Sequence, residues 1–416
     1  GLTCHDGEAL TAEDAAYSFN RVADPEMAFT GNSAGFVYKS IDFIEARADS
    51  ELDVTIVLGG PNHIALGLIS EIYVHCKGSY ENMTKEEAAT NPVGSGPYEF
   101  VKWDKGSQIV MKKTANPPIP TNFENIIWRV IPEASTRTAE LIAGNVDMIT
   151  NASPDQVEAI DASSTAKVAK VQGTRRMYVG YHQGPEFAVT PGGAAIQKPE
   201  VRRALQYAVD VEAICANLLN APCTRMTGIV NPNNAHPTLE PYPYDPEIAE
   251  YLLDQAGYPR DANGVRFEMT LQAGEGRYLN DRNVVLAICQ YLDEVGVKTE
   301  CDILDWSSVY IPLIIEKKAG PMYFIGSGGA TWSPLYDMAD LSKPDSGPNY
   351  TKWMNEEWFK GWKVINNTTN EYIIRREVDR MLEVFYNEGP WLHLYFQPDF
   401  YGVSNRVDWS PRRDEK

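Results

Sequence analysis

Strand-like and helix-like segments alternate along this chain, and the alternation limits the fold more than any other feature of the sequence. A short buried strand is predicted over residues 146–150, between helices that begin at Ser135 and Ser153. The same order returns later, where a helix separates the predicted strands 267–271 and 298–303. Segments in this order pack as layers of helices on a sheet, so the chain is predicted to be an α/β protein.

The composition is that of a folded, acidic protein. The 416 residues correspond to two to three domains at about 150 residues each. Hydrophobic residues make up 43% and charged residues 23%, which excludes a fully disordered chain, a collagen or a coiled coil. Lysine and arginine number 37 against 57 aspartate and glutamate, a net charge of −20. Such a surface repels nucleic-acid phosphates and anionic lipid, so no nucleic-acid partner is expected.

The cysteines indicate an oxidising compartment. The chain has six of them, an even number, and contains no C-x-x-C spacing. Two pairs are close in sequence, Cys215/Cys223 and Cys289/Cys301, and Cys4 and Cys76 are left over. Even counts with close spacing fit structural disulfides, and six buried free thiols in a cytosolic protein are the alternative. The chain opens at Gly1 without a charged n-region, so a signal peptide, if one exists, is not in this sequence.

One segment carries the pattern of a catalytic nucleophile. Residues 31–35 read G-N-S-A-G, a G-x-S-x-G with Ser33 at its centre. A nucleophile elbow needs a buried strand before it and a helix after it, and residues 24–30 are not a buried strand. A loop is therefore the preferred interpretation, and an α/β hydrolase that uses Ser33 is kept as an alternative.

Metal and phosphate motifs are not found. No two of the six histidines stand at i, i+4 spacing, and there is no H-E-x-x-H, so no metal is expected. Residues 326–329 read G-S-G-G after a strand-like segment. They lack the third glycine of a dinucleotide fingerprint and the Lys-Ser/Thr of a P-loop. Glycines after a strand let a backbone approach a ligand closely, so this segment is a candidate ligand loop.

Aromatic residues are abundant, with 9 Trp and 22 Tyr, and many fall in predicted loops or at strand ends. Aromatic side chains in loops often line small-molecule pockets, and packing under long loops is the alternative for each. The residues singled out on this ground are Tyr178, Tyr181, Tyr278, Trp306, Tyr310, Trp332, Tyr336, Trp391 and Tyr395.

Six segments occur in a fixed order across nearly the whole chain. They are CHDGEALTAED at 4–14, NPVGSGPY at 91–98, TR through GNVD at 136–147, PEVRRAL at 199–205, YDPE at 244–247 and AGYP at 256–259. Taken together they resemble the family 5 extracellular solute-binding proteins of ABC importers. This group includes the oligopeptide, dipeptide and nickel-binding proteins.

The resemblance implies a two-lobed, periplasmic-binding-protein-like α/β fold (type II, cluster C) with an extra subdomain. Mapped by order, residues 1–96 correspond to the extra subdomain, 97–180 with 401–416 to the first lobe, and 181–400 to the second. The crossings near Tyr181 and Tyr401 are then hinge candidates. Members of the family carry further residues before the H-D-G segment, so the N-terminal part of the first lobe is expected to be missing from this chain.

The resemblance also implies ligand-binding residues. Trp306 matches a pocket-lining tryptophan, and Arg277 with Tyr278 resembles a loop segment near the cleft. An arginine such as Arg277 can pair a ligand carboxylate bidentately, and an ordinary solvated arginine is the alternative. The residues that match strands beside the cleft, with hinge packing as their alternative, are Tyr178, Tyr181, His182 and Tyr395.

One departure from the family pattern concerns the ligand. Members often have a G-W-x-x-D-x-x-x-P segment whose aspartate takes the α-ammonium of a peptide. In this chain Ser327 stands at the tryptophan position and Ala330 at the aspartate position, and Trp332 is displaced by five residues. A buried ammonium without a carboxylate partner is costly, so a generic peptide is disfavoured as the ligand, and an opine, a modified peptide, a sugar or a metal chelate is favoured instead.

The sequence therefore predicts a monomeric periplasmic or cell-surface binding protein, with a lipid anchor as one option. It is expected to capture a small polar solute (peptide-like, an opine, a modified peptide or an oligosaccharide) and deliver it to ABC permease subunits. We expect no enzyme activity and no cofactor. Besides the hydrolase, the alternative is a ligand-sensing co-receptor whose closed form docks on a membrane sensor.

Overall fold

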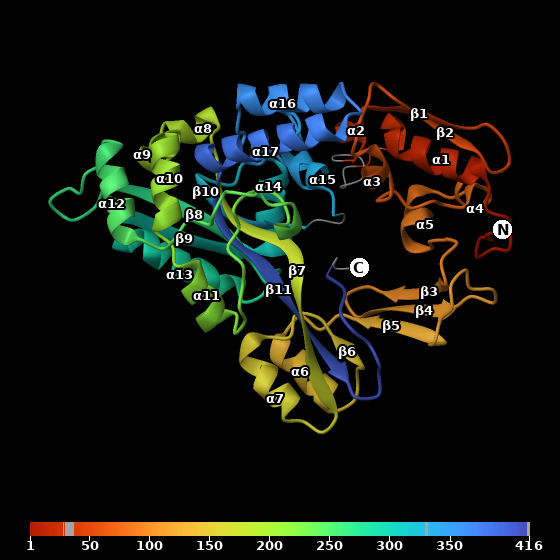
Figure 1. Ribbon diagram of the computed structural model, residues 1–416. Helices are drawn as coiled ribbons and strands as arrows, with labels where there is room; N and C mark the ends of the chain where they lie inside the picture. The colour runs from red at the N-terminus through yellow and green to blue at the C-terminus, as the bar shows by residue number, and fades with distance from the viewer. Residues whose placement is uncertain (28, 30–36, 329–331, 414–416) are drawn as a thin grey trace. The chain divides into compact units, whose positions relative to one another are not determined.

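The computed structural model describes residues 1–27, 29, 37–328 and 332–413 (Figure 1). The chain divides by its internal contacts into two compact units, Gly1–Pro132 and Glu133–Lys416. Each unit combines helices with strands, which confirms the predicted α/β class. The three-part division expected from the family resemblance stays a prediction.

The first unit begins with a helix packed on a two-stranded hairpin. Helix α1 (Ala12–Ala23) contacts β1 (Phe43–Ala48), which pairs antiparallel with β2 (Val54–Leu58). The helix starts at a capping box, in which the Thr11 backbone N–H donates to Asp14 Oδ2 at 2.7 Å. This hydrogen bond helps to fix where the helix begins, because the first backbone N–H groups of a helix have no partner inside it.

Short helices and a second small sheet complete this unit. Strands β3 (Tyr98–Asp104), β4 (Gln108–Lys113) and β5 (Asn125–Arg129) pair antiparallel in that order. The remaining elements are η1 (Pro25–Met27), α2 (Lys39–Ile41), α3 (Ala65–Ile69), α4 (Lys77–Tyr80) and α5 (Lys85–Thr90).

A six-stranded mixed sheet organises the second unit, in the order β6-β11-β7-β10-β8-β9. The two longest strands, β7 (Ala166–Tyr181) and β11 (Trp391–Ser404), pair antiparallel along most of their length (Figure 1). At one end β11 also pairs with β6 (Met148–Ile149), while at the other end β7 pairs antiparallel with β10 (Met322–Ser327). The sheet therefore runs through the whole unit.

Two more strands complete the sheet beside β10. Strand β8 (Phe267–Glu275) pairs parallel with β10 on one side and with β9 (Val297–Asp305) on the other. Parallel neighbours need a connection that crosses over the sheet, and α13 (Asp281–Glu294) supplies it between β8 and β9, with contacts to both. This is the strand, helix and strand order that the sequence predicted.

Helices from several parts of the chain accompany this sheet. They are α6 (Ala134–Ile142), α7 (Val157–Asp161), α8 (Pro185–Ala188), α9 (Pro191–Ala195), α10 (Pro199–Tyr207), α11 (Val211–Leu218), α12 (Pro246–Gln255), α14 (Ile311–Ile315), α15 (Pro334–Met338), α16 (Glu356–Asn366) and α17 (Glu371–Glu388). Shorter turns are η3 (Pro154–Gln156), η4 (Pro232–Asn234), η5 (Trp306–Tyr310) and η6 (Ala339–Leu341).

Aromatic rings form a large part of the core of this unit. The rings of Trp353 and Trp358 meet at 5.4 Å between centroids, and those of Phe385 and Trp391 at 5.2 Å. All four side chains are fully buried. Removing each such side chain from water is worth roughly 1.5–3 kcal/mol, so this cluster anchors α16 and α17 on the rest of the unit.

The six cysteines form three disulfides in the pairs expected from the sequence. Cys4 is bonded to Cys76 in the first unit, with 6.1 Å between Cα atoms. In the second unit Cys215 is bonded to Cys223 (5.7 Å) and Cys289 to Cys301 (6.3 Å). The last bond joins α13 to β9. Among the described residues, no helix is long and apolar enough to cross a membrane.

Candidate functional site

Three parallel strands of the second unit end at one edge of the sheet. Residues 276–278 follow β8, Trp306 follows β9, and Gly328 follows β10. In open α/β sheets, ligands bind in the crevice outside the carboxyl ends of the strands. We call this edge the rim, and it consists of Arg175, Arg277, Tyr278, Trp306 and residues 326–328.

Tyr278 is the residue around which the rim is built. Its ring meets Trp306 edge-on at 5.3 Å between centroids, and it meets Phe324 of β10 edge-on at 5.9 Å. The Tyr278 hydroxyl donates to the Gly326 carbonyl oxygen at 3.2 Å and accepts from the Gly326 N–H at 2.9 Å. Tyr278 is therefore buried and fixed, while Trp306 is only half-buried.

Two glycines pack against these rings at positions where a side chain would overlap them. A Cβ on Gly274, in β8, would lie 2.7 Å from the rings of both Trp306 and Tyr310. A Cβ on Gly326 would lie 3.0 Å from the Tyr278 ring. Gly274 and Gly326 thus leave room for aromatic side chains. The ligand loop expected over residues 326–329 stays a prediction, and Gly329 lies outside the described residues.

The turn that carries Arg277 is held by one buried carboxylate. Asp281 Oδ2 accepts the backbone N–H groups of Arg277 and Tyr278, each at 2.9 Å. Its other oxygen accepts the N–H of Gly276 at 3.3 Å, and that glycine has a φ of 89°, which side chains rarely adopt. The backbone of Arg277 is therefore fixed while its side chain remains exposed.

Two guanidinium groups flank the Tyr278 ring. The Arg277 guanidinium carbon lies 5.5 Å from the ring centroid, and the Arg175 carbon lies 5.9 Å from it. Burial raises the pKa of the Tyr278 hydroxyl, although both arginines and the Gly326 hydrogen bond act in the opposite direction. The hydroxyl therefore stays protonated at neutral pH. The rim combines positive charge with aromatic surface in a chain whose net charge is −20.

A buried ion-pair cluster contacts the rim at Ser327. Arg176 is 1% exposed, and its guanidinium lies 3.2 Å from Asp337 Oδ1 and 3.7 Å from Asp340 Oδ2. The same guanidinium donates to the Ser327 hydroxyl at 2.9 Å, and that hydroxyl donates to Asp340 at 2.6 Å. This cluster fixes the end of β10 at Ser327, just before Gly328.

Burial dominates the titration of both aspartates in this cluster. It raises the pKa of Asp337 to about 6, even though Arg176 lowers it. It also raises the pKa of Asp340, against the opposing effects of Arg176 and Ser327. The cluster was not predicted from the sequence. The only local signal was a pair of arginines, Arg175 and Arg176, inside a strand that is otherwise mostly buried.

The comparisons with known proteins decide the family. The model of the bacterial extracellular solute-binding proteins, family 5, matches residues 1–349 of the chain. This chain belongs to that family. Family 5 proteins are extracytoplasmic binding proteins that take up peptides or other small ligands and work with ABC transporter permeases.

Several family 5 relatives and structures are similar over nearly the whole chain. The oligopeptide-binding protein AppA of Bacillus subtilis is 22% identical, over 100% of this chain and 78% of its own length. The glutathione-binding protein GsiB of Escherichia coli K12 is 25% identical, over 95% of this chain and 75% of its own length. The crystal structure of NikZ from Campylobacter jejuni with Ni(L-His) superimposes with a TM-score of 0.82 at 21% identity. The superposition covers 98% of this chain and 82% of the NikZ chain. The predicted family 5 fold is confirmed.

Four of the residues expected from the family resemblance lie inside the second unit rather than at the rim. Tyr178 is stacked on Trp391 at 3.7 Å between centroids, and Tyr181 and Tyr395 are almost fully buried. His182 is also buried, with Nε2 3.0 Å from the Lys317 carbonyl oxygen and Nδ1 accepting from the Gly184 N–H. These positions fit the packing interpretation of the four side chains.

The remaining candidates are dispersed. Trp332 is 46% exposed, and the Arg413 guanidinium lies 5.8 Å from its ring centroid. The positions Ser33 and Ala330, on which the hydrolase alternative and the argument against peptides rest, lie outside the described residues. Across residues 1–27, 29, 37–328 and 332–413, no group of three or more His, Cys, Asp or Glu side chains is placed to hold a metal ion.

Proposed function

We propose that this family 5 protein binds a small polar solute that carries a carboxylate, and that the solute binds at the rim. The observation that carries the proposal is the exposed Arg277 side chain, whose backbone is fixed by Asp281 beside the Tyr278 and Trp306 rings. A guanidinium pairs a carboxylate through two parallel hydrogen bonds, and aromatic rings supply apolar contact area. The rim offers both to one ligand.

The chemical class of the ligand follows from the charges. Arg175 and Arg277 both lie within 6 Å of one ring, so the rim favours a solute with at least one anionic group. Acidic peptides, opines and modified peptides have such a group, and a neutral oligosaccharide does not. AppA is named for oligopeptides and GsiB for glutathione, both of which carry carboxylates.

We infer that the solute is held by closure of the second unit about the β7–β11 pair and is released unchanged. The register of this pair shifts between His393 and Phe396 and again between Phe396 and Pro398. Strands bend most readily where the ladder is interrupted, between the two predicted crossings near Tyr181 and Tyr401. The relatives are binding proteins and no observation favours the hydrolase, so no chemical step is proposed.

The cellular role follows from the family. We propose that the protein works as a monomer outside the cytoplasm, with or without a lipid anchor, and delivers its solute to an ABC permease. The three disulfides support an oxidising compartment.

The test is a thermal-shift and calorimetric screen of peptides, opines and oligosaccharides against the wild type, Arg277→Gln and Arg282→Gln. Arg282 is the matched control, because it is an exposed arginine nearby that is paired with Glu275 at 2.8 Å. We expect a carboxylate ligand to bind Arg277→Gln about 10- to 100-fold more weakly, since a hydrogen bond to a charged group is worth about 1.5–3 kcal/mol. The control should bind like the wild type. Equal affinity for all three proteins would contradict the proposal, and the largest shifts with di- and tripeptides would overturn the argument from Ala330.

A further inference from the structure

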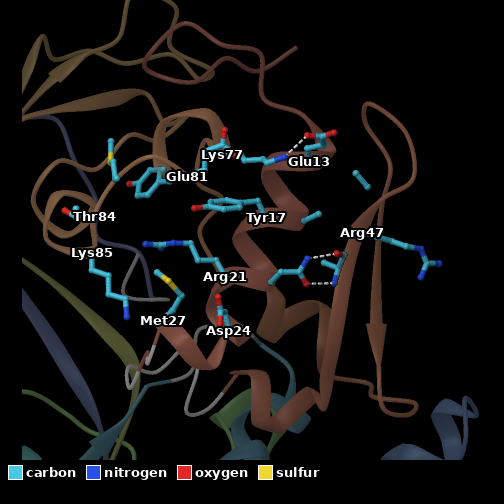
Figure 2. Close-up of a pocket in the computed structure, with 16 residues that line it drawn as sticks. Glu13, Tyr17, Arg21, Asp24, Met27, Arg47, Lys77, Glu81, Thr84 and Lys85 are labelled. Carbon is cyan, nitrogen blue, oxygen red and sulfur yellow. Dashed lines mark hydrogen bonds and ion pairs between the residues drawn. The ribbon is translucent and has the colours of Figure 1, made fainter.

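A cavity of about 890 Å³ lies in the first unit, among α1, β1 and residues 77–85 (Figure 2). Pockets that bind small molecules usually measure roughly 300–1,000 Å³, so this one has the size of a ligand site. Its walls include two tyrosine rings, Tyr17 and Tyr80, and two thioethers, Met27 and Met83. The family resemblance assigns no role to these residues.

Most charged groups of this cavity already have partners. Lys77 Nζ lies 3.1 Å from Glu13 Oε2, and Lys85 Nζ donates to the Glu26 carbonyl oxygen at 2.6 Å. Arg47 lies 3.2 Å from Asp49. These contacts satisfy each of the three cations from within the protein.

Arg21 differs from the other cations of the cavity. It lies in the last turn of α1, half-buried, with its guanidinium carbon 5.5 Å from the Tyr80 ring centroid and 5.2 Å from that of Phe29. In the described part of the chain, no carboxylate or carbonyl oxygen accepts a hydrogen bond from this guanidinium. Figure 2 shows its side chain between Tyr17 and Met27, among the residues that line the cavity.

A guanidinium between aromatic rings favours a particular class of ligand. Its planar fork matches a carboxylate, and the adjoining rings and thioethers match an apolar or aromatic body. Two more acidic groups, Asp24 and Glu81, line the cavity and disfavour a second negative charge such as that of a phosphate dianion. We propose that this cavity is a second binding site, for a small aromatic monocarboxylate whose carboxylate pairs with Arg21.

The proposal does not depend on the function of the rim, because the cavity lies wholly within residues 1–132. The test is isothermal titration of the full chain with benzoate, phenylacetate and indole-3-acetate, with phenylacetamide as the uncharged match of phenylacetate. We expect saturable binding of at least one carboxylate, and at least tenfold weaker binding of the amide. No saturable binding of any carboxylate, or equal binding of acid and amide, would overturn the proposal.

Three variants locate the binding. Arg21→Gln should weaken carboxylate binding at least tenfold, whereas Arg47→Gln, which removes a paired cation from the same cavity, should leave it within twofold. Met83→Trp should also abolish binding, because the larger side chain fills the cavity while the charge of Arg21 is retained. Circular dichroism checks that each variant folds. Binding that survives both Arg21→Gln and Met83→Trp, or that is lost in Arg277→Gln, would place the ligand elsewhere and overturn the proposal.

Discussion

The Tyr278 hydroxyl and the Gly326 backbone exchange two hydrogen bonds, one in each direction, at 3.2 Å and 2.9 Å. They join the turn after β8 to the end of β10 at the edge where three parallel strands end. The Tyr278 phenol therefore links the Arg277 turn directly to the end of β10, in addition to the pairing of β8 with β10. A change at this contact should therefore alter the affinity for a ligand that is held by both segments.

Replacing Tyr278 with phenylalanine should loosen the rim. The Gly326 N–H loses its partner in a half-buried position. A buried group left without a partner costs about 1–3 kcal/mol. We expect the free energy of unfolding in urea to fall by that amount and ligand affinity to fall about 3- to 10-fold. The control is Tyr251→Phe, because Tyr251 is 62% exposed. Unchanged stability and affinity in Tyr278→Phe would show that the pair of hydrogen bonds does not organise the rim.

Adding a methyl group at Gly274 should displace Trp306. The new Cβ would lie 2.7 Å from the rings of Trp306 and Tyr310, so at least one of them must move. Overpacking of this kind costs about 1–3 kcal/mol. We expect Gly274→Ala to lower stability by that amount and to weaken ligand binding at least threefold, as measured by urea titration and calorimetry. Gly60→Ala is the control, because a Cβ there meets nothing within 4 Å, and it should change neither quantity.

The protonation of Asp337 should make the free energy of unfolding fall as the pH rises. An aspartate whose pKa is lowered by an ion pair has the opposite effect. Burial raises the pKa of Asp337 to about 6, above its unfolded value of 3.8, so the folded state holds the proton more tightly. The stabilisation from this proton is complete below about pH 4 and is lost as the pH rises through 6. We expect the free energy of unfolding of the wild type, minus that of Asp337→Asn, to fall by up to about 3 kcal/mol between pH 4 and 7.

Urea titrations at several pH values measure this difference. Subtracting the variant removes the contributions of the other titrating groups, except those coupled to Asp337 through Arg176 and Asp340. A difference that rises with pH over this range would mean that the ion pair with Arg176 outweighs burial.

The three disulfides should contribute unequally to stability. In the loop-entropy model a bond that closes a longer loop stabilises more, and the separations are 72 residues for Cys4–Cys76, 12 for Cys289–Cys301 and 8 for Cys215–Cys223. Replacing both cysteines of a pair with serine should cost about 4 kcal/mol for the first and about 2–3 kcal/mol for each of the others. Urea denaturation of the three double variants measures the order. A larger loss from Cys215/Cys223 than from Cys4/Cys76 would contradict it.

The rim residues that the sequence predicted share one property. Arg277, Tyr278 and Trp306 each come within a few residues of the end of a strand, and strand ends can be read from local patterns. The parallel pairing of β8, β9 and β10 then brings them to one edge. The disulfides between Cys215 and Cys223 and between Cys289 and Cys301 were likewise predictable from short separations.

The parts that escaped prediction depend on contacts between distant segments. Arg176 meets Asp337 across 161 residues, and nothing near either residue indicates the pairing. The ligand-binding roles expected of Tyr178 and Tyr395 stay predictions, and the near-complete burial of both side chains could not be read from the strand sequences. Tyr178 is stacked on Trp391 of β11, and a backbone bridge joins Tyr395 to Arg225, so the surroundings of both rings depend on segments that are distant in the sequence.

Native mass spectrometry of freshly purified protein, for the wild type and for Arg277→Gln, tests most directly whether the rim binds a carboxylate-bearing solute and releases it unchanged. We expect a small carboxylate-bearing solute bound to the wild type, released on denaturation with the same mass after prolonged incubation, and largely lost from Arg277→Gln. A solute whose mass changes during incubation, or one that Arg277→Gln retains in full, would contradict this expectation.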